Sequence, residues 1–189
     1  MARRYPRIEP AHADFIARQK IFFVATAAPD GRVNLSPKGM DSLRVLDANR
    51  VIWLNLTGSG NETAAHLQES PRITLMFSAF EGDPLILRLY GQARAIHPRD
   101  PDWPSLLDHF PPLPGARQII DVNVDLVQSS CGMAVPLLDY VEDRQALSDW
   151  AQRKGPAGIE EYWREKNATS LDGKPIDLDA GRVRFEKTD

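Results

Sequence analysis

The feature that most constrains the fold is a succession of short segments with β-strand character, each bounded by residues that favour turns. These segments are rich in β-branched and aromatic residues, and they cover residues 21–27, 32–36, 43–46, 51–56, 72–77, 85–96 and 119–127. The last segment alternates apolar and polar residues, which predicts a half-exposed strand. Gly91 predicts a bulge that lets the sheet curl, whereas Pro37, which cannot donate to a ladder, predicts an interruption of its strand. The pattern as a whole predicts a mainly β (α+β) fold, an antiparallel barrel with added helices.

Helical patterns lie at both ends of the chain and between the strand segments, at residues 9–20, 100–110, 142–154 and 157–166. The first carries Phe15 and Ile16 among polar residues, which predicts an amphipathic helix that covers the core. Gly155 is expected to separate the last two helices. A chain of 189 residues is long enough for one domain with a substantial core. We therefore predict a single domain, 1–189, in which residues 142–189 form a helical C-terminal extension.

A glycine-rich turn, residues 57–67, joins the strand segment 51–56 to a short helix. Ser59 and Glu62 have the spacing of a capping box, which predicts that the helix starts here. The glycines beside Ser59 let the backbone approach a ligand closely, and the first N–H groups of the helix can bind a phosphate. The alternative is an ordinary connection between a strand and a helix. Because the Glu62 carboxylate would compete with a bound anion, a phosphate here requires cations from elsewhere in the chain.

Composition and motifs argue against several classes of function. The net charge is −3 and the basic residues are scattered, so nothing supports a nucleic-acid partner. No apolar run reaches membrane-spanning length and no apolar leader follows Met1, so we expect a cytoplasmic protein without a membrane partner. Cys131 is the only cysteine, which excludes an internal disulfide. The four histidines lack the spacing of metal ligands, and the sequence has no hydrolase elbow, Walker loop or dinucleotide-binding motif.

Small polar and basic residues at predicted strand ends and turns are the remaining candidates for a binding site. They are Ser36, Lys38, Arg44, Ser59, Asn61, Thr63, Arg88, Gln128 and Ser129. Each of them alone is typical of surface or turn structure. Together they suit a phosphorylated cofactor that lies on a barrel, where the cofactor carries the chemistry and the protein orients it.

Several phrases of the sequence resemble a subgroup of the pyridoxamine 5′-phosphate oxidase-like, FMN-binding split-barrel proteins. The phrases are residues 34–39, 57–63, 66–67, 75–77, 87–91, 114–118, 127–132, 166–167 and 170–173, which together extend over nearly the whole chain. The resemblance implies a six-stranded antiparallel split β-barrel with Greek-key connections, peripheral helices and a helical C-terminal segment. It also implies a homodimer that binds FMN at the subunit interface.

The resemblance further implies which residues contact FMN. They are Ser36 and Lys38 on one strand, Ser59, Gly60, Asn61, Glu62 and Thr63 in the turn, and, as weaker candidates from either subunit, Arg88, Gln128 and Ser129. The namesake enzymes carry an Arg-x-x-Leu-Leu-Lys cofactor motif and end in a substrate-binding Arg-Leu-x-Pro. This chain has Ser-Pro-Lys-Gly at residues 36–39 and Arg-Val-Arg-Phe-Glu-Lys at residues 182–187, so efficient oxidation of pyridoxamine 5′-phosphate is not expected.

Two classes of function agree with this resemblance. The first is an FMN-dependent oxidoreductase that acts by hydride transfer on a small substrate, with no general base required from the protein. The second is a non-catalytic flavin-binding protein that acts as a carrier, a sensor or an oligomeric scaffold. Haem or a deazaflavin is an alternative cofactor, because related barrels accommodate other planar groups. The sequence assigns no catalytic residue and names no substrate.

Overall fold

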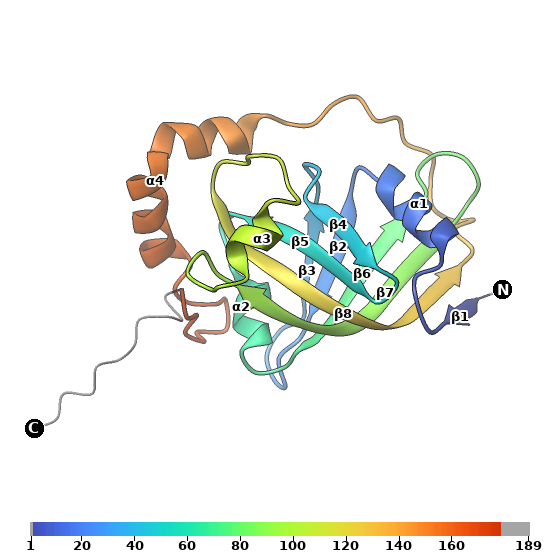
Figure 1. Cartoon of the computed structure of the whole chain (residues 1–189), viewed down its shortest axis with the longest axis horizontal. Helices are drawn as coiled ribbons and strands as arrows, with labels where there is room; N and C mark the ends of the chain where they lie inside the picture. The colour runs from blue at the N-terminus through green and yellow to red at the C-terminus, as the bar shows by residue number, and fades with distance from the viewer. Residues whose placement is uncertain (1, 179–189) are drawn as a thin grey trace, which may run out of the picture.

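The computed structural model describes residues 2–178, and an antiparallel sheet forms the centre of this part of the chain (Figure 1). The strands are β1 (Arg3–Tyr5), β2 (Phe22–Thr26), β3 (Asn34–Lys38), β4 (Leu43–Asp47), β5 (Arg50–Leu56), β6 (Arg72–Ser78), β7 (Ile86–Ile96) and β8 (Ala116–Ser130). The helices are α1 (Pro10–Arg18), α2 (Glu62–Leu67), α3 (Trp103–Leu107) and α4 (Ala146–Lys166). The strands pair in the order β3-β2-β6-β7-β8-β5-β4, and β1 pairs with β8 outside this path. A mainly β fold with peripheral helices is therefore confirmed.

The number of strands and the closure of the sheet differ from the expectation. Within residues 2–178 the sheet has eight strands, whereas the family resemblance implied six, and no pairing joins β3 to β4 at the two ends of the path. The turn after β3 holds Met40 and Asp41 at positive φ, 63° and 52°. The first helix, α1, lies along the opening, where its Ile16 lines a cleft of about 510 Å³ together with Phe22 and Leu43. The opening is thus covered by a helix and is not closed by strand pairing.

The strand β3 runs through Pro37, which was expected to interrupt it. Pro37 pairs with Phe23 of β2, and β3 is the edge strand of the path. A proline is tolerated in an edge strand, because its missing N–H can face away from the neighbouring strand. The continuous strand places Ser36 and Lys38 on the same face of the sheet, two residues apart.

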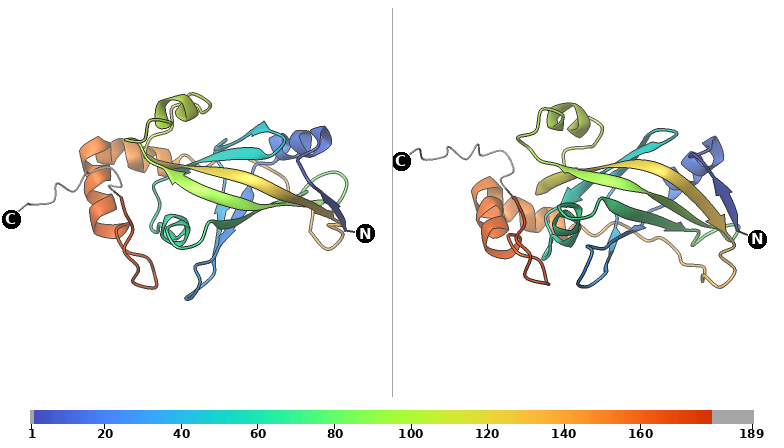
Figure 2. Two further views of the ribbon diagram at one scale, coloured as in Figure 1. Left: turned by 60° about the horizontal axis from the view of Figure 1, so that its bottom comes forward. Right: turned by 90° about the horizontal axis from the view of Figure 1, so that it is seen from below.

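Two hydrophobic clusters cover the two faces of the sheet around β5 and β8. The inner cluster contains, among others, Val24, Trp53, Leu75, Leu89 and Ile120, and the outer cluster contains Ile52, Leu54, Trp103, Leu106 and Ile119. Figure 2 shows α3 on one side of the sheet and α2 on the other. Because α3 covers the outer face, residues 117–122 of β8 are all buried. The predicted half-exposed strand is found only in the second half of β8, where Asn123 and Asp125 are exposed.

Two glycines interrupt regular structure where the sequence predicted it. The register of β7 and β8 shifts between Tyr90 and Gly91, and a methyl group on Gly91 would lie 2.1 Å from the carbonyl oxygen of Asn123. Gly155, with φ 65° and ψ 171°, divides α4 into two helical parts, and the bend is visible in Figure 1. The first part begins at Ala146, four residues later than predicted. Residues 179–189 of the predicted C-terminal extension lie outside the described residues. Among residues 2–178, no helix is both long and apolar enough to span a bilayer.

Candidate functional site

The glycine-rich turn connects β5 to α2 as expected, but the predicted capping box is wrong. The N-cap of α2 is Asn61, and its side chain makes no capping hydrogen bond. Glu62 is the first helical residue, and its Oε1 accepts a hydrogen bond from the backbone N–H of Leu171 at 2.9 Å. Ser59 lies two residues before the N-cap, and the Glu62 carboxylate is bound by the segment that follows α4. Because α2 has only six residues, its N-terminus alone attracts an anion weakly.

A buried cation near this turn is Arg117, the second residue of β8. Its side chain is 3% exposed, and its Nη1 donates to the carbonyl oxygen of Gly60 at 3.1 Å and to Oδ1 of Asn167 at 2.5 Å. Burial lowers the pKa of Arg117 to about 10, against a smaller opposing effect of Tyr162, so the guanidinium remains charged at neutral pH. Both acceptors are neutral, and within residues 2–178 no carboxylate pairs with this cation.

A second cation, Lys38, stands at the end of β3, and its Nζ is 5.5 Å from the centroid of the Trp53 ring. Burial, followed by the positive charge of Arg117, lowers the pKa of Lys38 to about 8. Arg117 is therefore close enough to disfavour the charge of Lys38, and Lys38 too has no carboxylate partner in the described part of the chain. Unpaired buried charge is costly, so this arrangement favours the binding of an anion.

Buried polar atoms without hydrogen-bond partners occur on the strands and the turn that surround the two cations. They are Asn61 Oδ1 and Nδ2, Arg117 Nε, Gln118 Nε2 and Trp53 Nε1, for which residues 2–178 provide no hydrogen bond. Gln118 is connected to β5, because its Oε1 accepts a hydrogen bond from Asn55 at 3.0 Å. Folded proteins satisfy nearly all buried polar groups, so this concentration indicates a ligand site. We refer to Lys38, Asn61 and Arg117 as the anion site.

A hydrogen-bond network beside the anion site contains two further predicted residues, Ser36 and Thr63. Asn34 Nδ2 donates to Thr63 Oγ1 at 3.2 Å and to Thr26 Oγ1 at 3.1 Å, and Ser36 Oγ donates to Asn34 Oδ1 at 3.0 Å. Thr26 Oγ1 is also 3.0 Å from Nδ1 of His66 in α2. These bonds fix β3 against α2, and so they hold the strand that carries Lys38. In the described residues, no group of three or more His, Cys, Asp or Glu side chains is arranged to bind a metal.

The predicted residues Arg88, Gln128 and Ser129 lie at the end of the β7–β8 pair that is remote from Arg117. Gln128 is eleven residues beyond Arg117 in β8, which is about 36 Å along a strand. Arg88 Nη1 donates to Ser130 Oγ at 3.2 Å, and Gln128 Oε1 accepts a hydrogen bond from the hydroxyl of Tyr90, also at 3.2 Å. Figure 1 shows this end of β8 beside β1, whereas the other end lies beside α3 and α4. Within one chain these three residues are therefore distant from Arg117.

The residues that sequence reasoning missed are Arg117, Gln118 and Asn167. Arg117 and Gln118 belong to a phrase that carried the family resemblance, but they were given no role. A charged residue two positions before the apolar pair at positions 119 and 120 was an available signal, since such a residue is rarely buried without a partner. The candidate Arg44, in contrast, is paired with Asp41 at 2.8 Å.

Comparison with known proteins gives consistent results in sequence and in structure. Residues 8–131 match the sequence profile of the family described as pyridoxamine 5′-phosphate oxidase. The pyridoxamine 5′-phosphate oxidase family protein ustO of Aspergillus flavus is 37% identical over 180 residues, and the match covers 86% of this chain and 72% of ustO.

Among solved structures, a variant of HupZ from Group A Streptococcus has a TM-score of 0.53 at 19% identity, covering 65% of this chain and 99% of HupZ. A Lactobacillus delbrueckii protein has a TM-score of 0.52 at 18% identity, covering 65% of this chain and 94% of that protein. At these identities the two structures support the fold alone. The profile match extends over more than half of the chain, and ustO exceeds 30% identity over most of it. This chain therefore belongs to the pyridoxamine 5′-phosphate oxidase family.

Proposed function

We propose that this protein binds FMN, with its phosphate at the anion site, and acts as an FMN-dependent oxidoreductase on a small substrate. The observation that carries the proposal is the pair of buried cations, Lys38 and Arg117, which have no carboxylate partner. Arg117 also bonds the carbonyl oxygen of Gly60, the residue before Asn61, whose side-chain amide has no partner. Membership of the family supports the choice of a flavin. A bound flavin would supply the transfer of a hydride equivalent, and the protein would bind and orient it.

The chemistry of the site fits a phosphate ester. A phosphate monoester carries a charge of about −1.5 to −2 at pH 7, which matches two cations. Asn61 Nδ2 and Arg117 Nε are unpartnered donors that could bind its oxygens. A methyl group on Gly58 or Gly60 would meet no protein atom nearer than 4.0 Å or 3.8 Å respectively, so the backbone of the turn is open to a close approach.

To contact the ring system of the cofactor, the two remaining unpartnered donors would have to become accessible, because Trp53 is 1% and Gln118 0% exposed. Gln118 Nε2 and Trp53 Nε1 are buried on the inner face of the sheet, and a flavin ring offers nitrogen and oxygen acceptors. Donors near the edge of the ring that becomes negative on reduction would stabilise the reduced form. We assign no catalytic base, because the proposed chemistry requires none.

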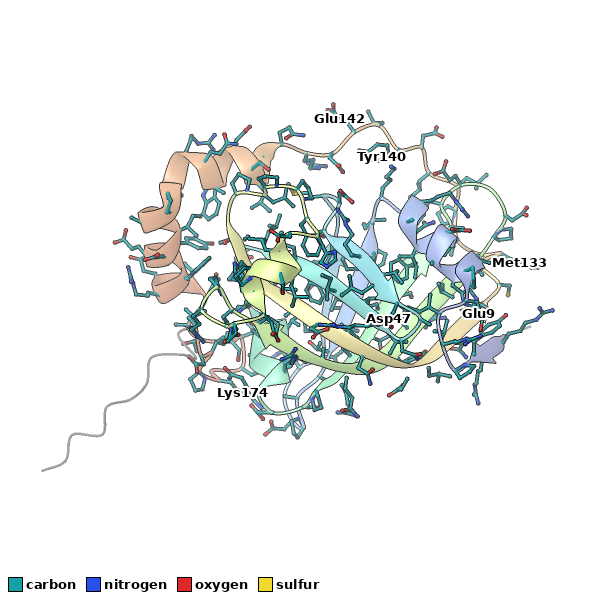
Figure 3. All side chains as sticks on the ribbon, viewed as in Figure 1. Glu9, Asp47, Met133, Tyr140, Glu142 and Lys174 are labelled. Atoms are coloured by element: carbon teal, nitrogen blue, oxygen red, sulfur yellow. The ribbon has the colours of Figure 1, made fainter. Side chains whose placement is uncertain are left out.

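We further propose that the protein is a homodimer with FMN at the subunit interface. The segment between β8 and α4 exposes large apolar side chains, among them Met133 (81% exposed), Leu137 (75%) and Val141 (87%). Met133 and Tyr140, labelled in Figure 3, lie at the periphery of the molecule. A second copy of the chain would cover these exposed apolar side chains. In such a dimer, Arg88, Gln128 and Ser129 of one subunit could contact a cofactor bound at the anion site of the other.

The first experiment is an absorption spectrum of the purified protein, before and after incubation with FMN, with mass spectrometry of the released cofactor and light scattering. We expect a flavin spectrum, FMN as the released molecule and a dimer. A haem or deazaflavin spectrum would contradict the choice of FMN, and a monomer that binds FMN tightly would contradict the dimer.

A second experiment tests catalysis, by aerobic and anaerobic turnover of the FMN-loaded protein with NADH, NADPH and candidate acceptors. Tight FMN binding without any turnover would favour a flavin carrier or sensor. Pyridoxamine 5′-phosphate is expected to be a poor substrate, because the chain lacks the C-terminal motif of the namesake enzymes. Residues 182–187, where that departure occurs, lie outside the described residues. Turnover of this compound at roughly 1 per second or more would contradict the expectation.

A further inference from the structure

The residue that follows α4, Asn167, connects Arg117 of the anion site to the glycine-rich turn. Its side chain is fully buried, at 0% exposure. Its Oδ1 accepts a hydrogen bond from Arg117 Nη1 at 2.5 Å, and its Nδ2 donates to the carbonyl oxygen of Gly58 at 3.1 Å. One amide therefore holds the buried guanidinium on one side and the glycine-rich turn on the other.

The contacts of Asn167 are not those of an ordinary helix cap. Its backbone N–H bonds to the carbonyl oxygen of Trp163 and terminates α4, which any residue could do. The side chain instead reaches partners 50 and 109 residues away in sequence. The adjoining helix is attached to the same turn, because Trp163 Nε1 donates to Thr57 Oγ1 at 2.8 Å.

The side-chain amide of Asn167 is uncharged, and this leaves the positive charge of Arg117 available to attract an anion. Arg117 Nη1 donates to two acceptors, Asn167 Oδ1 and the carbonyl oxygen of Gly60, and neither carries a charge. The guanidinium is thus oriented without being neutralised. An aspartate at position 167 could accept the same hydrogen bond, but its negative charge would cancel the charge that attracts the ligand.

The segment after Asn167 also provides a hydrogen-bond donor for the Glu62 carboxylate. Glu62, the acidic residue expected to compete with a bound anion, accepts its hydrogen bond from the backbone N–H of Leu171. Asp172 and Lys174 of the same segment bind Arg32 and Asp30 respectively, which attaches the segment to the turn between β2 and β3. The whole segment is therefore held across the elements that form the anion site.

We infer that Asn167 is a positioning residue that makes the anion site selective for phosphate-bearing ligands, by orienting Arg117 without cancelling its charge. The inference rests on the proposed binding of FMN. It assigns to the C-terminal segment a role in cofactor selection in addition to its packing against α2.

The test compares Asn167→Asp and Asn167→Ala with wild type in fluorescence titrations with FMN and with riboflavin, which lacks the phosphate. For Asn167→Asp we expect a loss of FMN affinity of roughly tenfold to a hundredfold, with riboflavin affinity changed by less than about threefold. For Asn167→Ala the FMN loss should be smaller, because Arg117 keeps its charge and loses only its orientation. Thermal melts without ligand should show Asn167→Asp close to wild type in stability, because the new carboxylate pairs with a buried cation but can no longer donate a hydrogen bond to the carbonyl oxygen of Gly58.

A merely structural role predicts the opposite order. Aspartate keeps the contact with Arg117 and loses only the donor to Gly58, whereas alanine loses both contacts, so aspartate would then be the milder change, and both ligands would be lost in parallel. That result would overturn the inference. If Asn167→Asp does not fold, Asn167→Ala alone decides, because equal losses for FMN and riboflavin would again overturn it. Asn123→Asp, an exposed change on the same β8 strand, is the matched control and should leave both affinities unchanged.

The titrations distinguish a failure of the role of Asn167 from a failure of the proposed FMN binding. If wild type binds neither FMN nor riboflavin, the proposed function fails before any variant is compared. If wild type prefers FMN and both Asn167 variants keep that preference undiminished, the proposed function stands and the role of Asn167 is refuted.

Discussion

Replacing Lys38 with methionine should stabilise the ligand-free protein and weaken FMN binding at the same time. Burial and the neighbouring charge of Arg117 lower the pKa of Lys38 from 10.5 to about 8. Because one pKa unit corresponds to 1.36 kcal/mol, a shift of this size means that the charged ammonium costs the folded state about 3 kcal/mol at neutral pH. The contact of Lys38 Nζ with the Trp53 ring offsets about 0.5–1 kcal/mol of this cost.

The net effect of Lys38→Met on the ligand-free protein should therefore be a gain of about 2 kcal/mol in the free energy of unfolding. For a chain of this length, the gain corresponds to a rise in Tm of about 4–8 °C. The same change would remove the proposed charge-assisted hydrogen bond to the phosphate. Such a bond contributes about 1.5–3 kcal/mol, so FMN affinity should fall roughly tenfold to a hundredfold. Riboflavin affinity should change little, because riboflavin has no phosphate.

The assay is calorimetry of the ligand-free proteins at pH 7, together with fluorescence titrations with FMN and riboflavin. Lys20→Met is the matched control, because Lys20 also lies over an aromatic ring, that of Tyr140 at 5.3 Å, but is exposed. It should change the free energy of unfolding by no more than about 0.5 kcal/mol and leave both affinities unaltered. A Lys38 variant with an unchanged or lower Tm and equal losses for the two ligands would refute the reasoning, because it would make Lys38 a packing residue only.

The remaining predictions concern the pH dependence of stability and of FMN affinity, and the backbone packing at Gly91. The pKa of Lys38 is lower in the folded protein than in the unfolded chain, so the unfolded state binds more protons between about pH 8 and 10.5. The free energy of unfolding of wild type, relative to that of Lys38→Met, should therefore rise with pH across that window. A bound phosphate favours the charged ammonium, so FMN affinity should fall as the pH rises above about 8, by up to tenfold per unit, in wild type but not in Lys38→Met; parallel profiles for FMN and riboflavin would contradict this. Gly91→Ala should destabilise the protein by about 3 kcal/mol or more in urea unfolding, because its methyl group would lie 2.1 Å from a backbone oxygen. Gly158→Ala, a helical glycine whose added methyl would touch only a flexible lysine side chain at 3.5 Å, is the control and should be neutral or stabilising.

Much of the secondary structure could be predicted, because it depends on residues close together in sequence. The apolar and β-branched runs marked seven of the strands, and β1 was missed because three residues give too short a pattern. The breaks at Gly91 and Gly155 were found because each glycine reports a local backbone requirement. The prediction at Pro37 failed because the sequence does not say which strands lie at an edge.

The candidate site was predicted only in part, because its members meet through long-range contacts. The turn 57–63 and the pair Ser36 and Lys38 were visible as short phrases. Arg117 was not assigned, since its role depends on Gly60 and Asn167, which lie 57 and 50 residues away.

The sequence alone determined which segments form strands, where helices lie near the two ends of the chain and where the glycine-rich turn lies. Local periodicity and backbone preference suffice to specify these features. Tertiary structure alone decided which cations reach the turn, where the Glu62 carboxylate binds and which face of β8 is covered. The physical reason is that burial, pKa and hydrogen-bond partners depend on what packs against a residue from distant parts of the chain. A lysine at a strand end is an ordinary surface residue by its local sequence, and it becomes part of the anion site only when β8 brings Arg117 close enough to affect its pKa.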